Sequence, residues 1–311
     1  MEVRLQQLRY FVTVAQTRHF TQAAAVIGVS QPALSKQIHS LETELGAPLF
    51  ARIRGAVALT PAGEALLPIA TRILADVETA RREVREIVGA QRGRVRLGVI
   101  PSMCTSVAPQ VLRRFRAHHP DVELQVEEGG SRDLVRDLRQ GELDLAMIVL
   151  PTQGIDPALL AEPILRERLV VASVDPLPAT SRQGTIRIGD LRDEPLVMFR
   201  TGYDLRDVTL RACQEAGFEP TFAVEGGEMD AVLSFVEAGL GVAVVPGTVL
   251  SGRPRLRATP LTPPGVLRTV ALAHRRETAL THAAQAFRDT LLAYLRAAEQ
   301  ESMLPAGVEP L

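Results

Sequence analysis

The stretch from Phe20 to Leu45 constrains the fold of this chain more than any other. It predicts two short helices separated at Gly28-Val29, with Thr21 as the N-cap of the first helix and Ser30 as the N-cap of the second. Pro32 falls in the first turn of the second helix, where its missing N–H costs nothing. Several alanines on the first helix allow close crossing by the second. This arrangement is typical of a helix-turn-helix.

The second helix has an apolar face and a polar face. Its apolar residues are spaced as one buried stripe requires: Leu34, Ile38, Leu41 and Leu45. The residues expected to face a DNA groove are Thr21, Ser30, Gln31, Pro32, Ser35, Lys36 and His39, with Ser40 on the flank. Lys36 is the one lysine in the chain, and all other Lys/Arg positions are arginine. A solvated surface lysine is the alternative, but the surrounding pattern favours a DNA-contacting role.

The flanking segments extend this module. Residues 5–15 carry apolar side chains at helical spacing and predict a further helix that packs on the pair. Residues 51–60 alternate like a two-stranded ribbon, the wing of a winged helix-turn-helix. Arg52 and Arg54 on this ribbon are candidates for contacts with phosphates or the minor groove. Surface arginines on an ordinary hairpin are the alternative.

Charge is concentrated at this end of the chain. The whole sequence has a net charge of −1, whereas residues 1–60 hold six cations and three anions, which gives +3. A small basic module on a near-neutral protein suits DNA binding by one end only. We expect a cytoplasmic protein without membrane contact, because no stretch resembles a signal peptide or a membrane span and two distant cysteines provide no disulfide framework.

Residues 8–67 resemble the N-terminal domain of the LysR-type transcriptional regulators. The resemblance is nearly unbroken through FTQAAAVIGVSQPALSKQI, LETELGAPLF and LTPAGEALL. It implies a dimeric, usually tetrameric, activator or repressor that responds to a small-molecule effector. The implied partners are double-stranded DNA, an effector and further copies of the chain. A dimer would hold two recognition helices at a fixed separation, so the DNA site should be a spaced inverted repeat.

A long helix follows the wing. Thr60 is the expected N-cap, Pro61 occupies the first position, and the helix should continue to about Val88. Its apolar residues follow a four-three repeat: Leu66, Ala70, Ile73, Val77, Ala80, Val84 and Ile87. This heptad pattern predicts a dimerisation seam, with packing against the same chain as the alternative. Gly89 to Gly93 should end the linker.

From residue 94 onward short apolar runs alternate with helices, as in a sheet covered by helices. Expected strands of the first lobe are 95–100, 122–128 and 143–150; those of the second are 195–199, 221–226 and 242–246. Segments 169–174 and 268–274 should connect the lobes, and a last helix should span 279–298. The expected fold is α+β and multidomain: a winged helix-turn-helix (1–60), a linker helix (61–92), a two-lobed α/β effector domain like periplasmic binding proteins (93–301) and a loose tail (302–311).

Effector chemistry should lie between the lobes, where strand ends meet helix N-termini. The candidate residues are Ser102, Met103, Gly130, Ser131, Arg200, Thr201, Gly227 and Pro246. Ser102 and Ser131 match positions where the resemblance implies hydroxyls against the effector. Together with Arg200 and free helix N–H groups, they suit a small carboxylate. The alternative is that both serines only cap their helices.

Other classes of function fit the sequence poorly. It contains no phosphate-binding loop, zinc-protease motif, nucleophile elbow or metal-spaced Cys/His cluster, so we expect no enzyme, no cofactor and no metal site. His118-His119 should end a helix rather than bind metal. A redox-sensing regulator that uses Cys104 is the remaining alternative, although Cys213 is expected in the other lobe. A transport protein is disfavoured by the N-terminal domain and by the lack of a signal peptide.

Overall fold

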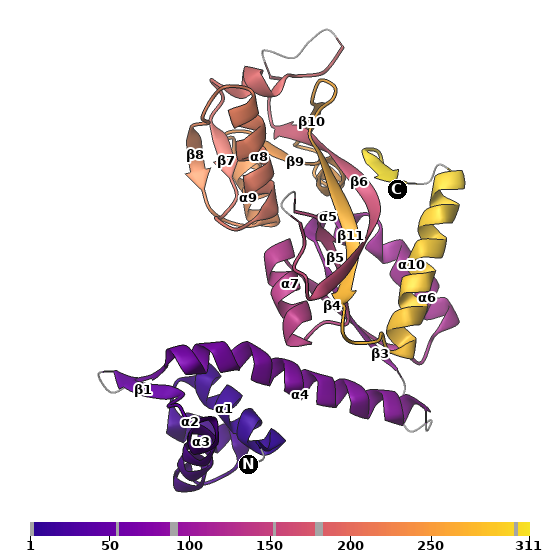
Figure 1. The fold of residues 1–311 in the computed structure, drawn as a ribbon. Coiled ribbons are helices and arrows are strands. Elements are labelled where there is room, and N and C mark those ends of the chain that lie inside the picture. The colour runs from indigo at the N-terminus through magenta and orange to yellow at the C-terminus, as the bar shows by residue number, and fades with distance from the viewer. Residues whose placement is uncertain (1–2, 54–55, 88–92, 152–153, 178–182, 302–303) are drawn as a thin grey trace. The chain divides into compact units, whose positions relative to one another are not determined.

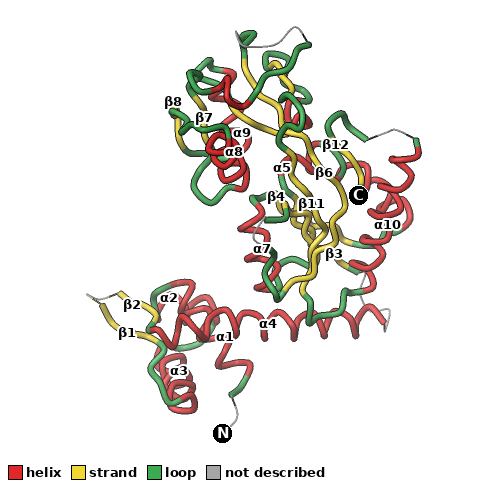
Figure 2. Tube along the Cα trace, turned by 45° about the horizontal axis from the view of Figure 1, so that its top comes forward, coloured by secondary structure: helices red, strands yellow, loops and turns green. Residues whose placement is uncertain are grey.

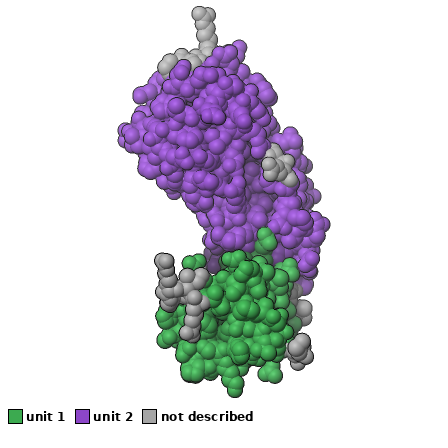
Figure 3. All heavy atoms as spheres, turned by 60° about the vertical axis from the view of Figure 1, so that its left-hand side comes forward, with its two compact units in different colours: residues 1–91, 139–142 green, residues 92–138, 143–311 purple. Residues whose placement is uncertain are grey.

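The computed structural model describes residues 3–53, 56–87, 93–151, 154–177, 183–301 and 304–311. The chain divides into two compact units, one of residues 1–91 with 139–142 and one of the remaining residues (Figure 3). Within the described ranges, no helix has the length and apolar character needed to cross a membrane.

The N-terminal unit is a winged helix-turn-helix followed by a long helix (Figure 1). Its elements are α1 (Leu5–Thr17), α2 (Phe20–Ile27), α3 (Gln31–Leu45), β1 (Phe50–Ile53), β2 (Ala56–Leu59) and α4 (Pro61–Ile87). Phe11, Leu34 and Leu41 are fully buried where the helices meet. The ring of Phe50 packs against Phe11 and Phe20, with centroids 5.3 Å and 5.8 Å away. These contacts attach the antiparallel β1–β2 ribbon to the helices.

The turn between α2 and α3 depends on its glycine and on two caps. Gly28 has φ 78°, a left-handed conformation that favours glycine, and its N–H bonds to the carbonyls of the last turn of α2. Ser30 caps α3 as expected, because its Oγ accepts from the N–H of Ala33. The cap expected at Thr21 is wrong. His19 caps α2 instead, and Thr21 lies inside the helix with its side chain exposed.

The expected apolar stripe of α3 ends one turn early. Leu34, Ile38 and Leu41 are buried, whereas Leu45 is 42% exposed. Leu45 is the last residue of the helix, and Gly46 turns the chain away at φ 71°. The stripe therefore covers only the part of α3 that faces the other helices.

Helix α4 begins with a close approach to the backbone before the wing. Thr60 caps the helix, since its Oγ accepts from the N–H of Gly63 at 3.1 Å. The same hydroxyl donates to the Pro48 carbonyl at 2.6 Å, and the Thr60 N–H donates to the Leu49 carbonyl. A Cβ at Gly63 would collide with that Leu49 carbonyl, so this position requires glycine. Pro68 lies within the helix without ending it.

The predicted seam of α4 divides into two halves. Leu66, Ala70 and Ile73 belong to the apolar cluster of their own chain, and Ala70 is fully buried in it. In this half these three side chains pack on their own chain. Val84 is 61% exposed and Ala80 is exposed as well. The side chain of Ile87 and the expected linker end at 88–92 lie outside the described residues.

The C-terminal unit has two lobes, each with its own apolar cluster. The first lobe contains β3 (Arg94–Val99), α5 (Pro101–Thr105), α6 (Ala108–His118), β4 (Glu123–Glu128), α7 (Ser131–Gln140), β5 (Leu145–Val149) and α10 (His282–Gln300). β3 pairs in parallel with β4 and β5, as the alternating pattern predicts. The sequence predicts one helix from about Thr105 to His118; the structure has α6 from Ala108 to His118, and Thr105 instead ends the separate short helix α5.

Two long antiparallel strands run through both lobes. β6 (Leu159–Ser173) and β11 (Leu267–Arg275) lie side by side (Figure 2). β11 also pairs with β5 of the first lobe, and β6 pairs with β9 (Ala243–Pro246) and β10 (Arg257–Pro260) of the second. The expected connecting segment at 169–174 is only the end of β6, which is far longer. These strands are the structural link between the lobes.

The second lobe completes the C-terminal unit. Its remaining elements are η1 (Ile188–Leu191), β7 (Leu196–Met198), α8 (Asp204–Glu215), β8 (Phe222–Glu225), α9 (Met229–Glu237) and η2 (Gly247–Leu250). β7 and β8 are parallel, and α8 and α9 lie beside them (Figure 1). The two-lobed α/β architecture expected from the sequence is confirmed.

The loose tail expected at 302–311 is wrong for its described residues. β12 (Val308–Pro310) pairs with β6 in antiparallel register. Val308 is buried, and Glu309 accepts from the Arg168 guanidinium at 2.8 Å. The tail is ordered by a partner strand that lies far away in sequence.

Candidate DNA-binding and effector sites

The polar face of α3 is exposed over the length that the sequence predicts. Gln31, Pro32, Lys36 and His39 are exposed, and Ser35 is half-buried. Gln31 Nε2 donates to Ser35 Oγ at 3.0 Å, which arranges the amide on the helix surface. Among the described residues, no carboxylate lies within ion-pair distance of Lys36. Its ammonium group is therefore available to an external acceptor.

Two contacts fix this face relative to the rest of the module. Gln7 of α1 is buried, and its Nε2 donates to Ser40 Oγ at 3.3 Å, so Ser40 holds α3 against α1. Glu42 Oε1 accepts from the backbone N–H groups of Leu49 (2.8 Å) and Phe50 (3.3 Å). Glu42 thereby connects the end of α3 to the start of the wing. Sequence reasoning missed Gln7 and Glu42, which are polar residues inside otherwise ordinary helices.

Of the two wing arginines, the structure describes only the backbone of Arg52. Arg52 lies in β1, opposite Val57, and its side chain is outside the described atoms. Arg54 lies outside the described residues. The predicted contacts of both arginines with phosphates or the minor groove stay predictions.

Arg200 of the second lobe lies against the first lobe. Its Nη2 donates to Asp133 Oδ2 of α7 at 2.6 Å, and its Nε donates to Glu228 Oε1 at 2.8 Å. The hydrogen bonds that Arg200 donates, first to Glu228 and then to Asp133, raise its pKa. The arginine chosen for effector recognition is already neutralised by two carboxylates of the protein, and one of these pairs joins the lobes.

The glycine-rich loops bring the other candidates near Arg200. A Cβ on Gly130 would lie 3.3 Å from the Tyr203 ring, so the loop before α7 approaches the second lobe closely. Tyr203 is buried and stacks on Phe199 at 4.9 Å, and burial raises its pKa. The N–H of Arg200 donates to the Gly227 carbonyl at 3.0 Å. Gly130, Arg200 and Gly227 are therefore brought together as expected.

The two predicted serines are both occupied within the protein. Ser131 Oγ accepts from the N–H of Val149 at 3.0 Å, a bond that ties α7 to β5. Ser102 is fully buried, donates to Glu167 Oε2 at 2.9 Å and accepts from Arg268 Nη2 at 2.7 Å. Neither contact is the helix cap considered as the alternative.

Ser102 belongs to a buried ionic cluster at the centre of the domain, defined as Ser102, Glu167, Asp204, Thr248 and Arg268. The side chains of Arg268 and Glu167 are only 3% and 1% exposed and lie 2.7 Å apart. Arg268 also donates to Asp204 at 2.7 Å, and Thr248 donates to Glu167 at 3.4 Å. Burial works against the charged form of Arg268, but the attraction of Glu167 and Asp204 prevails and raises its pKa.

This cluster joins elements of both lobes. Ser102 is on α5 of the first lobe, Asp204 begins α8 of the second, and Glu167 and Arg268 stand on β6 and β11. No local sequence pattern predicts this cluster, because its members come from five separate segments. Three other candidate residues do not belong to the buried ionic cluster. Met103 is fully buried in the apolar cluster of the first lobe, Pro246 ends β9, and Thr201 is exposed.

The surroundings of the cysteines do not favour a thiolate. Burial and then the negative charge of Glu128 raise the pKa of Cys104 to about 12. Burial raises the pKa of Cys213 to about 11. Cys104 packs against the first-lobe cluster and Cys213 lies in the second-lobe cluster. A reactive cysteine needs the opposite environment, with cations or a helix N-terminus lowering the pKa.

The adjacent histidines also have structural partners. The ring of His119 stacks on Phe115 at 4.6 Å, and His118 Nδ1 bonds to the Arg114 carbonyl at 2.9 Å. The described part of the chain brings together no group of three metal-binding side chains.

Both parts of the chain match known protein families. Residues 5–64 match the bacterial regulatory helix-turn-helix proteins of the lysR family, and residues 89–296 match the LysR substrate binding domain. The chain belongs to the LysR family of transcriptional regulators. It thus combines a DNA-binding domain with a domain that binds a small-molecule effector, as the sequence analysis expected.

Relatives of this LysR-family regulator are themselves regulators. The chain is 31% identical to the transcriptional dual regulator GltC of Bacillus subtilis, over 96% of this chain and 99% of the relative. It is 36% identical to a probable hydrogen peroxide-inducible genes activator of Streptomyces viridosporus, over 79% of this chain and 78% of the relative. Among solved structures, a full-length OxyR variant from Pseudomonas aeruginosa is 31% identical with a TM-score of 0.69, covering 94% of this chain and 95% of that one.

Proposed function

We propose that this LysR-family regulator reads a spaced inverted repeat through α3. Gln31, Ser35, Lys36 and His39 contact base edges, while the wing arginines Arg52 and Arg54 contact backbone or the minor groove. Thr21, Ser30 and Pro32 lie at the approach to the groove. The observation that carries this proposal is Lys36, which is exposed on the polar face of α3 and has no ion-pair partner among the described residues. The regulator would act in the cytoplasm.

Gel-shift competition between the target site and random DNA tests the reading residues. Lys36→Ala should lower the preference for the site, because a base contact is lost. Arg54→Ala should weaken binding to both DNAs by a similar factor, because a phosphate contact carries no sequence information. An unchanged specificity ratio in Lys36→Ala would refute the assignment.

Two copies pair through the exposed C-terminal half of α4, around Val77, Ala80 and Val84, and such pairs form tetramers. The support is the four-three repeat together with the exposure of Val84 and Ala80 in a single chain. The first half of α4 is already used by its own chain. This division confines the proposed contact to the second half.

The effector binds between the lobes, near the loops that carry Ser102, Met103, Gly130, Ser131, Arg200, Thr201, Gly227 and Pro246. A small carboxylate is the proposed class, with Arg200 as its partner. Because Asp133 and Glu228 occupy that guanidinium, the effector carboxylate must compete with Asp133. Such displacement breaks an interlobe ion pair. The effector can therefore shift the equilibrium between two arrangements of the lobes only by the difference between its affinities for them.

A further inference from the structure

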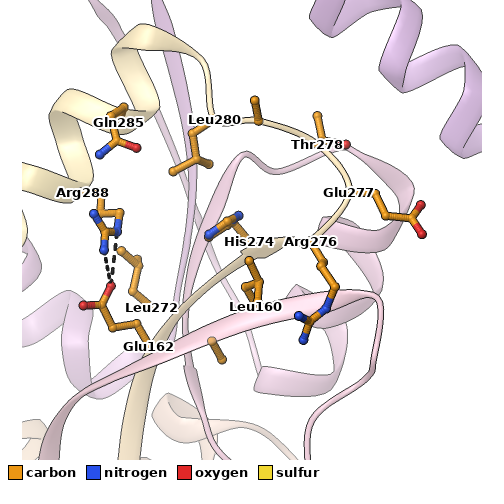
Figure 4. Close-up of a pocket in the computed structure, with 12 residues that line it drawn as sticks. Leu160, Glu162, Leu272, His274, Arg276, Glu277, Thr278, Leu280, Gln285 and Arg288 are labelled. Atoms are coloured by element: carbon orange, nitrogen blue, oxygen red, sulfur yellow. Dashed lines mark hydrogen bonds and ion pairs between the residues drawn. The ribbon is translucent and has the colours of Figure 1, made fainter.

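A hollow of about 610 Å³ lies on the first lobe, at the ends of the two long strands (Figure 4). It is lined by residues of β6, β11, the segment after β11 and α10. Its volume falls in the range of about 300–1,000 Å³ that is typical of small-molecule sites. The hollow contains none of the residues proposed for the interlobe effector.

The floor of the hollow is apolar and firmly held. Leu160, Ala161 and Leu272 come from the paired strands, and Leu280 faces them from the segment before α10 (Figure 4). In the β6–β11 register His274 lies opposite Leu160, so the floor is a hydrogen-bonded ladder. Leu160 is nevertheless 38% exposed. Covering this leucine with an apolar group would remove its surface from water, which is favourable.

The rim carries a cation that no acid neutralises. Arg276 donates to the backbone carbonyls of Pro157 (3.0 Å) and Leu159 (3.3 Å), and within the described ranges no carboxylate lies at ion-pair distance from it. Arg288, on the opposite rim, is paired with Glu162 at 2.7 Å. Figure 4 shows the two guanidinium groups at opposite sides of the apolar floor. Glu277 also lines this side of the hollow, but among the described residues it forms no ion pair with Arg276, so the guanidinium can bind an external anion.

His274 adds a polar group between the two rims. Its Nδ1 lies 2.9 Å from the Arg275 carbonyl, which can only accept a hydrogen bond. The proton must therefore be on Nδ1, and Nε2 is left for another partner. The Nε2 atom accepts a hydrogen bond in the neutral ring and donates one in the protonated ring. A carboxylate only accepts hydrogen bonds, so Nε2 can bind it only when the ring is protonated.

We propose that this hollow is a second ligand site for a monocarboxylate with an apolar body. The apolar body covers Leu160 and lies against Leu280, and the carboxylate binds Arg276 and the protonated form of His274. The opposite portions of the same strands carry Glu167 and Arg268 of the buried ionic cluster. A ligand in the hollow therefore binds the strands that link the lobes, which gives it a route to regulation separate from the interlobe effector.

Calorimetric titration of the full-length protein with hexanoate, hexanol and hexylammonium tests the site. The three probes have the same apolar chain and differ in charge. Hexanoate should bind, and Arg276→Gln should weaken its binding about ten-fold, the loss expected for one charge-assisted hydrogen bond. Leu160→Glu should abolish binding, because it places a like charge on the floor. Arg257→Gln, which removes an exposed charge from β10, is the matched control and should change nothing.

Arg200→Gln separates this site from the interlobe one. Hexanoate affinity should be unchanged in that variant if the ligand occupies the hollow. The proposal is overturned if hexylammonium binds as well as hexanoate, if Arg276→Gln leaves the affinity unchanged, or if Arg200→Gln removes it. A loss in Arg200→Gln alone would instead place the probe between the lobes. The hollow is also refuted if no probe binds while an interlobe effector still does.

Discussion

Replacing Arg268 by methionine should destabilise the effector domain more than almost any other single change. The substitution removes the hydrogen bonds of the guanidinium to Glu167 (2.8 Å), Asp204 (2.7 Å) and Ser102 (2.7 Å). Glu167 is only 1% exposed, so its negative charge then stays buried without a cation beside it. Only the hydroxyl groups of Ser102 and Thr248 still donate hydrogen bonds to it. Breaking a buried pair in this way costs about 3–5 kcal/mol. Asp204 is 15% exposed and regains some water, so the loss should not exceed that range.

Urea unfolding followed by circular dichroism measures this loss, since the chain has no tryptophan to report by fluorescence. The double variant Arg268→Met with Glu167→Gln removes both charges and should recover most of the stability. Arg288→Met is the control, because its pair with Glu162 is far more exposed and should contribute no more than about 1 kcal/mol. The reasoning is refuted if Arg268→Met costs no more than that control, or if the double variant is no better than Arg268→Met alone.

Three further outcomes follow from the geometry. Val84→Asp should abolish the dimer in sedimentation while α1 to α3 remain folded. Ile73→Asp should in addition disturb the packing of its own chain. A normal dimer in Val84→Asp would place the interface elsewhere. Asp133→Asn should raise the affinity for a carboxylate effector a few-fold in thermal-shift titration, because Arg200 loses a competitor; thermal shifts with neutral or cationic ligands alone would contradict this. Cys104 should be alkylated at pH 8 at least ~100-fold more slowly than free cysteine, and the rate should rise with pH toward its pKa of about 12; rapid alkylation would revive the redox alternative.

Local patterns were enough to predict the N-terminal module. The spacing of Leu34, Ile38 and Leu41 sets one face of a helix, and the cap at Ser30 depends only on the residues that follow it. Thr21 was misjudged because His19 offers a ring nitrogen two residues earlier, an acceptor that cap preferences rank low. The four-three repeat of α4 could not show which half packs on its own chain. Packing on the same chain and pairing with a second chain require the same spacing of apolar residues.

Non-local pairing explains the other misses. Residues 308–310 have no strand pattern of their own and become a strand because β6 offers a free edge. The buried ionic cluster is equally non-local, although one signal was present: Arg268 is a charged residue inside the apolar run RTVALAH. A charge in such a run requires a buried partner. The run alone does not say that the partner is Glu167.

Arg200 shows how far the site itself could be predicted. Its place at a strand end was correct, as was its proximity to Gly130 and Gly227. Its two carboxylate partners were not foreseen, because Asp133 is 67 positions away and no short motif joins them. The sequence therefore predicted where Arg200 lies but not the two carboxylates that bind it.

The contact between Gly63 and the Leu49 backbone has a mechanical consequence. With Thr60 bonded to Pro48 and Leu49, the first turn of α4 and the base of the wing form one rigid joint with no flexible segment between them. A rotation of the long helix should therefore turn the base of the wing with it. A larger side chain at Gly63 would force this joint apart, so torque on the helix would no longer reach the wing.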